Sequence, residues 1–156
     1  MANWGIDREE LAWCAGFFDG EGNVGAYDRK KGDYIQPRLI LQIAQTDSFV
    51  LERFAKAVGV GNLTGPYKPK TLKSSVYWCY RIEGMNNVQH VVALMWNWLS
   101  PQKQGDAIVA MNRARAWMAR TECQKGHGVK LMTNGSTYCP TCRSESAKKS
   151  RARVVI

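Results

Sequence analysis

The stretch Leu-Ala-Trp-Cys-Ala-Gly-Phe-Phe-Asp-Gly-Glu-Gly, residues 11–22, carries the strongest structural signal in this chain. Leu11, Cys14 and Phe18 are spaced as apolar side chains are on the buried face of an amphipathic helix. Asp7 is a suitable N-cap for that helix, because its carboxylate can accept hydrogen bonds from the free N–H groups of the first turn. The stretch therefore predicts a helix packed against a core.

A second face of the same predicted helix carries a row of small residues. Ala12 and Gly16 are four residues apart, and Ala15 with Asp19 extend the row. Small side chains let two helix backbones approach closely, a geometric effect best described for helices in membranes. The row therefore predicts a close contact between two helices.

Two glycines at the end of the stretch predict a sharp turn from helix into strand. Gly20 and Gly22 tolerate the backbone angles of such a turn, and it brings Asp19 and Glu21 to the end of the helix. A carboxylate there is a hard oxygen ligand of the kind that Mg²⁺ prefers. On its own, however, Asp-Gly-Glu-Gly is more typical of an ordinary acidic turn.

The rest of the first 119 residues predicts two β-hairpins and three more helices, in the order α-β-β-α-β-β-α-α. This order is typical of an α+β domain with a four-stranded antiparallel sheet and helices on one face. The expected helices cover Ile6–Phe18, Ser48–Val58, Asn86–Leu99 and Gln102–Met118, and the expected strands cover Asn23–Arg29, Tyr34–Gln45, Gly61–Tyr67 and Ser75–Glu83.

The other face of this sheet is expected to be bare of helices. The alternation of the first two strands places amide, arginine and aromatic side chains there, which suit contacts to phosphates and base edges in a DNA groove. A solvated sheet face without a partner would show the same alternation. The residues are Asn23, Gly25, Tyr27 and Arg29 in the first strand and Gln36, Arg38, Ile40 and Gln42 in the second.

Together these features resemble the LAGLIDADG family of homing endonucleases. The core of the motif is Cys14-Ala-Gly-Phe-Phe-Asp-Gly-Glu-Gly22, with Cys14 where leucine is usual and Glu21 where a second aspartate is usual. The resemblance covers about residues 6–118 and implies a saddle-shaped sheet over double-stranded DNA. Because the chain has one motif, it also implies a homodimer that pairs the motif helices and cuts a nearly palindromic site.

The resemblance further implies a set of catalytic residues. Glu21, with Gly20 beside it, matches the motif positions that hold Mg²⁺ or Mn²⁺ at the phosphodiester, where water is the attacking nucleophile. Gln45 matches a polar position that organises water, and Lys103 matches a basic residue that polarises this water or the phosphate. Both residues also have simpler interpretations. Gln45 would suit a helix cap, and Lys103 would suit a solvated position in the first turn of a helix.

The chain is basic, with 22 Lys and Arg against 13 Asp and Glu and a formal net charge of +9. This balance favours a polyanionic partner, nucleic acid before a membrane surface. The excess is greatest from residue 120 onward, where eight basic residues accompany two glutamates. We expect phosphate contacts from this tail, through Arg143, Lys148 and Lys149, and from the loop between the third and fourth strands, through Lys68, Lys70 and Lys73.

Three of the five cysteines lie in the tail beside a histidine. Cys123-x3-His127 and Cys139-x2-Cys142 together supply four ligands with a spacing suited to tetrahedral Zn²⁺. Four protein ligands leave no open position, so the site is expected to be structural; three unrelated thiols and a histidine are the alternative. Asn134-Gly135 favours a hairpin turn between the two ligand pairs.

The tail is similar to small zinc-ribbon-like modules of phage and mobile-element nucleases. We therefore expect a LAGLIDADG-like endonuclease domain over residues 1–119 and a zinc-binding basic module over residues 120–156. No apolar run reaches the ~18 residues of a membrane span, and the first residues lack the pattern of a secretory signal. We expect an intracellular, cytoplasmic protein of bacterial or phage origin, with an organellar origin left open.

Other functions stay open at this point. A transcription regulator or an intron RNA maturase on the same scaffold would bind DNA or RNA without cutting it. Glu21 favours the enzyme, but an acid there would also serve as a helix-end cap. An interaction module without nucleic acid conflicts with the basic tail.

Overall fold

The computed structural model describes residues 7–31, 34–68, 75–132 and 137–152. Its centre is a four-stranded antiparallel sheet with the strand order β1-β2-β4-β3. Two hairpins, β1–β2 and β3–β4, are joined by pairing of β2 with β4, and the expected α+β architecture is confirmed. The strands are β1 (Gly22–Lys31), β2 (Tyr34–Gln45), β3 (Asn62–Tyr67) and β4 (Tyr77–Glu83).

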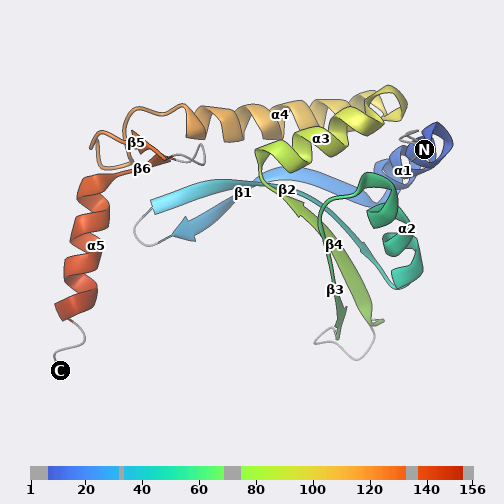
Figure 1. The fold of residues 1–156 in the computed structure, drawn as a ribbon, viewed down its shortest axis with the longest axis horizontal. Helices are drawn as coiled ribbons and strands as arrows, with labels where there is room; N and C mark the ends of the chain where they lie inside the picture. Colours follow the sequence, from blue (N-terminus) through green and yellow to red (C-terminus); the bar gives the residue numbers. More distant parts are fainter. Residues whose placement is uncertain (1–6, 32–33, 69–74, 133–136, 153–156) are drawn as a thin grey trace, which may run out of the picture.

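Helices cover one face of this sheet and leave the other bare, as expected. In Figure 1, α3 and α4 lie along the upper side of β1 and β2, while β3 and β4 extend downward, away from these two helices. The buried core lies between the sheet and the helices, and it includes Phe18, Leu41 and Phe54. The helices are α1 (Arg8–Glu21), α2 (Ser48–Val58), α3 (Met85–Met95) and α4 (Pro101–Met118), with a 3-10 turn, η1 (Trp96–Trp98), between the last two. Among the described residues, no helix has both the length and the apolar character to cross a membrane.

Helix α1 has the expected N-cap, Asp7, but it begins at Arg8, two residues later than expected, and ends three residues later than expected. The Asp7 carboxylate caps it by accepting hydrogen bonds from the backbone N–H groups of Glu9 and Glu10, at 3.0 and 3.2 Å. The helix continues through Gly20, so the chain turns into β1 at Gly22 alone. A Cβ atom at Gly22 would lie 1.9 Å from the Phe18 ring, and glycine is therefore required at this turn.

Most other elements lie where the sequence pattern places them. Strand β2 and helix α2 have the expected bounds, and α2 is capped by Asp47 and ended by Gly59, whose φ of +73° suits glycine. The expected helix over residues 86–99 is shorter, because the chain passes into η1 after Met95.

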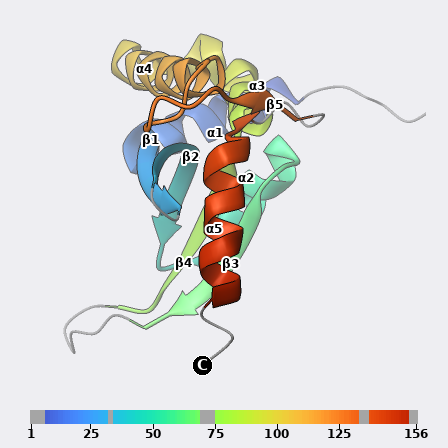
Figure 2. The same ribbon diagram turned by 90° about the vertical axis from the view of Figure 1, so that its left-hand side faces the viewer.

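The tail contains a helix that the sequence pattern did not reveal. A two-stranded hairpin, β5 (Lys130–Leu131) with β6 (Thr137–Tyr138), precedes α5 (Pro140–Ala152). Figures 1 and 2 both show α5 extending away from α3 and α4, past the end of the β1–β2 hairpin. The expected Asn134-Gly135 turn falls outside the described residues.

Cys14 of the motif is fully buried in the core, and this predicts an unreactive thiol. Burial, with a smaller contribution from the Glu10 carboxylate, raises the pKa of Cys14 to about 12. At pH 8 its thiolate fraction is then about a thousandfold below that of a free cysteine. In the folded protein, a maleimide reagent should modify half-buried Cys79 and leave Cys14 intact until denaturant is added. Peptide mass spectrometry would report both residues, and equal labelling of the two in native buffer would contradict the packing of α1.

Candidate nucleic-acid interface and metal centre

The uncovered sheet face carries the polar side chains that the alternation of the strands predicts. Asn23, Tyr27 and Arg29 of β1 are exposed, while Val24 between them is buried toward the helices. Tyr27 donates a hydrogen bond to the Asn23 side chain, and its ring covers Gly25. Ile40, expected on the same face, is only 8% exposed and so offers little surface to a partner.

Strand β4 contributes residues to this face that were not among the expected ones. Arg38 donates to the Glu83 carboxylate, and Arg81 donates to the Gln42 amide oxygen at 3.1 Å. Asn62 of β3 is exposed beside Arg81, its register partner. Polar and apolar residues alternate from Tyr77 to Glu83 as they do in β2, so the same pattern would have identified these side chains.

The β3–β4 half of the face is hollowed. A concavity of about 560 Å³ is lined by polar and aromatic side chains from both strands. The rings of Tyr67 and Tyr77 flank it with their centroids 5.5 Å apart. Hydrogen-bonding groups beside aromatic rings suit the edge of a nucleic acid groove.

The C-terminal end of α1 presents an acidic side chain at one end of the sheet. Glu21 is exposed as the last residue of the helix, and no described side chain is bonded to its carboxylate. The carbonyls of the last helical turn, including that of Gly20, belong to the helix end that carries partial negative charge. This group of oxygens attracts a cation.

Lys103 lies at the same place. Its Nζ donates a hydrogen bond of 2.7 Å to the carbonyl oxygen of Gly22, the residue directly after Glu21. Asp19 fixes this arrangement, because its two carboxylate oxygens accept from the backbone N–H and the hydroxyl of Ser100, at 2.8 and 3.0 Å. Ser100 is in turn the N-cap of α4 and accepts from the Lys103 N–H at 3.2 Å. A basic and an acidic side chain, 82 positions apart in the sequence, are thus held at one helix end.

Gln45 is the last residue of β2 and lies at this end of the sheet. Gly22 pairs with Ile43, two residues before Gln45, so the start of β1 and the end of β2 are neighbours. Gln45 is half-buried. The structure therefore places Glu21, Gln45 and Lys103 at one end of the sheet.

Of the four residues expected in a contact with a second helix, Ala15 and Asp19 instead make contacts within this chain. Ala15 is fully buried in the core, and Asp19 is occupied by Ser100. Half-buried Ala12 and the exposed Gly16 and Gly20, spaced four residues apart, lie along one side of α1. A Cβ atom added at either glycine would meet no heavy atom within 4 Å, so this face of the helix is open.

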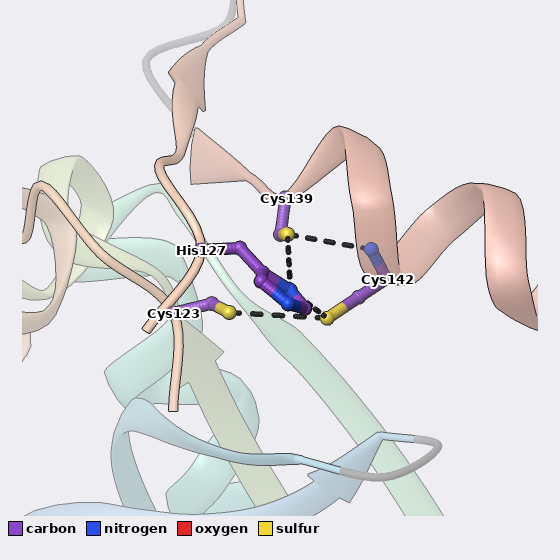
Figure 3. A group of neighbouring side chains, drawn as sticks. All are labelled: Cys123, His127, Cys139 and Cys142. Atoms are coloured by element: carbon purple, nitrogen blue, oxygen red, sulfur yellow. Dashed lines mark hydrogen bonds between the residues drawn. The ribbon is translucent and has the colours of Figure 1, made fainter. Parts of the chain in front are cut away.

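The four tail ligands converge as the sequence predicts. Figure 3 shows the three sulfurs and the imidazole of His127 directed toward one another, with Cys139 and Cys142 at the start of α5. All four ligand atoms lie within 4.8 Å of one another. The sulfurs of Cys123 and Cys142 are 3.8 Å apart, and the Cys142 sulfur is 3.4 Å from His127 Nδ1. Ligands at about 2.0–2.3 Å around one Zn²⁺ would be separated by such distances.

Backbone N–H groups support this cluster. Lys125 donates to the Cys123 sulfur and Cys142 donates to the Cys139 sulfur, both at 3.4 Å. Burial raises the pKa of Cys123, but hydrogen bonds from the backbone of Lys125 and His127 and from the other two thiols outweigh it and lower the pKa to about 7. Burial and the neighbouring sulfurs instead raise the pKa of Cys142 to about 11. The turn at Cys123 thus favours a thiolate, the form that binds metal.

The basic residues expected to contact phosphates are exposed where the structure describes them. Lys68 follows β3, and Arg143, Lys148 and Lys149 lie on α5, whose residues 143–152 are all exposed. Lys70 and Lys73 fall outside the described residues.

The architecture matches that of solved LAGLIDADG homing endonucleases. I-CvuI, a homing endonuclease solved with its DNA target, is 23% identical with a TM-score of 0.57, over 68% of this chain and 66% of that one. I-GzeII, a LAGLIDADG homing endonuclease solved with a DNA target, is 18% identical with a TM-score of 0.55, over 69% of this chain and 37% of that one. The homing endonuclease I-TnaI is 22% identical with a TM-score of 0.51, over 63% of this chain and 66% of that one.

This chain therefore has the LAGLIDADG homing endonuclease fold, and the resemblance seen in its sequence is confirmed at that level. The matched region spans slightly less than two thirds of I-CvuI. No protein-family model matches the sequence, and no curated protein matches it significantly.

Proposed function

We propose that this protein is a site-specific DNA endonuclease that acts as a homodimer on double-stranded DNA and requires a divalent metal ion. One observation carries the proposal: in a LAGLIDADG fold, the Lys103 ammonium is bonded to the carbonyl of Gly22, the residue after exposed Glu21, at the end of an uncovered, polar sheet. A sheet that only bound DNA would not need a carboxylate at this position, because a carboxylate repels the phosphates of DNA.

The donor set at the end of α1 suits Mg²⁺ or Mn²⁺. The Glu21 carboxylate and the carbonyl of Gly20 are hard oxygen ligands, and the helix end adds partial negative charge. A bound ion would stabilise the negative charge that develops on the phosphate as its ester bond breaks. Lys103 would contribute a second positive charge, and Gln45 would orient the attacking water through its amide.

The open face of α1 supports the homodimer. Two copies that cross at Ala12, Gly16 and Gly20 would bring their backbones close, because these side chains are small or absent and no described residue lies over the two glycines. Each Glu21 lies one residue beyond Gly20, so the pairing would place two carboxylates together beneath one duplex. Two related half-sites follow from that two-fold symmetry.

We further propose that Cys123, His127, Cys139 and Cys142 bind one structural Zn²⁺, and that residues 120–156 form a metal-folded module. The described part of this module has no buried apolar side chain, so its packing cannot hold it together. The exposed basic side chains of α5 would contact the phosphate backbone beside the saddle.

A selection experiment tests the proposed function. The purified protein is incubated with a randomised duplex library in Mg²⁺ or in EDTA, and bound and cleaved molecules are sequenced separately. We expect enrichment of one near-palindromic site, cut only when the metal is present, and affinity that falls steeply with salt. Sites that are bound but never cut would instead favour a regulator or a maturase. Salt-dependent binding is measured in parallel for duplex DNA and for structured RNA, and its absence for both would exclude nucleic acid as the partner.

The zinc proposal makes a prediction about composition. Cys139→Ser removes one of four ligands, and zinc measured by elemental analysis should fall from one ion per chain to less than about a tenth of that. The variant should also lose protection from proteolysis between residues 120 and 152, while the sheet domain stays intact. Cys79→Ser, outside the cluster, is the matched control; full zinc content in Cys139→Ser would refute the four-ligand site.

A further inference from the structure

The end of the β1–β2 hairpin extends beyond the core of the protein. We call residues 27–31 of β1 and 34–38 of β2 the arm. None of its described side chains belongs to the buried core, and β4 pairs with β2 only over Ile40–Gln45. A two-stranded hairpin without a third strand or a core is marginally stable in water. The arm therefore needs support from elsewhere.

Two side chains from outside the arm supply such support. Arg113 of α4 donates to the Asp28 carboxylate at 2.5 Å. Gln124, which follows the first cysteine of the Cys/His cluster, bonds to the backbone of Ile35. Gln124 accepts a hydrogen bond from the Ile35 N–H through Oε1 and donates one to the Ile35 carbonyl through Nε2, both at 3.1 Å. Strand β4 does not pair with this part of β2, whose edge is left uncovered. The side-chain amide of Gln124 thus takes the place of a neighbouring strand there. The next residue whose backbone faces that edge is Pro37. Proline has no N–H group, so the edge has no unpaired donor there.

These contacts lie on the side of the arm away from the expected DNA face. Ile35, Pro37 and Gln124 border a space of about 360 Å³ together with Arg113 and Trp117 of α4. In the alternation of β2, Ile35 and Pro37 share the helix-covered side with Leu39, whereas Arg38 lies on the open side. The cluster thus continues the helix layer past the end of α4 and leaves the open side of the arm accessible.

The position of Gln124 depends on the metal ligands around it. It lies between Cys123 and His127, in a turn closed by hydrogen bonds from the Cys123 N–H to the His127 carbonyl and from the Gly126 N–H to the Cys123 carbonyl, at 2.8 and 2.9 Å. The cluster has no apolar core, so a metal ion would be what makes this turn rigid.

We propose that metal binding by Cys123, His127, Cys139 and Cys142 fixes the arm through Gln124, and that this sets the arm's open side against the outer base pairs of each half-site. The DNA part of this proposal rests on the proposed function. β1 begins beside Glu21 and ends, at the usual rise per residue, roughly 30 Å away, so the arm reads DNA far from the cut. Gln124 is a positioning residue, and the zinc cluster controls recognition without touching the bases.

Hydrogen exchange measured by mass spectrometry on the full chain without DNA tests the contact itself. Removal of zinc by a chelator should speed exchange of the arm peptides by about tenfold or more, while peptides over β4 and α1 keep their protection. Gln124→Ala should produce the same change with its zinc still bound, and Gln124→Glu, which keeps the acceptor and loses the donor, should be intermediate. Gln89→Ala on α3, remote from the arm, is the matched control. Unchanged arm exchange in both zinc-free protein and Gln124→Ala would overturn the proposal.

A second readout tests the consequence for DNA. On the selected site, Gln124→Ala should lose discrimination against substitutions at the outer base pairs, by about tenfold per position, and keep discrimination at the central ones. Uniformly weakened binding at all positions would overturn the recognition part. If the wild-type protein binds no nucleic acid, the proposed function fails, and the exchange experiment still decides whether zinc and Gln124 hold the arm.

Discussion

Glu21→Gln should bind its DNA site with the affinity of the wild-type protein and fail to cut it. Glutamine keeps the size and hydrogen-bonding oxygen of the side chain but removes the negative charge that would hold the divalent ion. Loss of several kcal/mol of charge stabilisation in the transition state corresponds to a fall in cleavage rate of about a thousandfold or more. Single-turnover cleavage and a gel-shift titration on the same duplex measure the two quantities.

An exposed acidic residue away from the proposed site provides the control for this experiment. Glu52 is exposed on α2, on the helix side of the sheet, and Glu52→Gln makes the same change in charge. Its cleavage rate should equal that of the wild-type protein. Undiminished cutting by Glu21→Gln would show that the carboxylate does not hold the catalytic ion, and loss of binding together with cutting would assign it to DNA recognition.

Gly16→Leu should abolish the dimer and, with it, double-strand cleavage, while the fold stays intact. A Cβ atom at Gly16 would meet no described heavy atom within 4 Å, and leucine is favoured over glycine in a helix by about 1 kcal/mol. The leucine would, however, hold apart two α1 helices that cross at this point. Sedimentation velocity should show a monomer at concentrations where the wild-type protein is a dimer, with an unchanged or higher Tm.

Gly105→Leu is the matched control for the glycine substitution. Gly105 is also a helical glycine with open space around its missing Cβ, but it lies on α4. This variant should remain dimeric and active. A dimer that persists in Gly16→Leu would mean that the copies meet through another surface.

The sequence predicted the sheet and its helices well because each element carries its own local signal. Alternating residues in β2 and the caps Asp47 and Gly59 specify these elements within a few positions of the chain. The end of α1 was misplaced because Gly20 is a weak helix former and looks like a turn residue. In the structure the helix continues to Glu21, and only Gly22 lies so close to Phe18 that glycine is required.

Contacts between residues that are far apart in the sequence could not be predicted from local sequence patterns. Nothing in the sequence around Asp19 indicates Ser100, 81 residues away, and so Asp19 was assigned to a contact with another helix. The pairing of Gln124 with Ile35 spans 89 residues and is made by a side chain that mimics a strand. Both contacts depend on how the helix layer is placed on the sheet.

Helix α5 was missed for a different reason. It has no apolar stripe, because every residue from 143 to 152 is exposed. The usable signals were Pro140 at its first position and the good helix formers that follow. The Cys/His cluster, in contrast, was identified because ligand spacing is itself a local pattern.

The most direct test of the central claim is to map the ends produced when the wild-type protein acts on its selected site in Mg²⁺. We predict one cut on each strand, placed symmetrically about the centre of a near-palindrome, and no cut in EDTA. This result would place two Glu21 carboxylates at one duplex, as the proposed pairing of two α1 helices requires. A site that stays bound and intact in Mg²⁺ and in Mn²⁺ would contradict the endonuclease and leave a DNA-binding protein on the same fold.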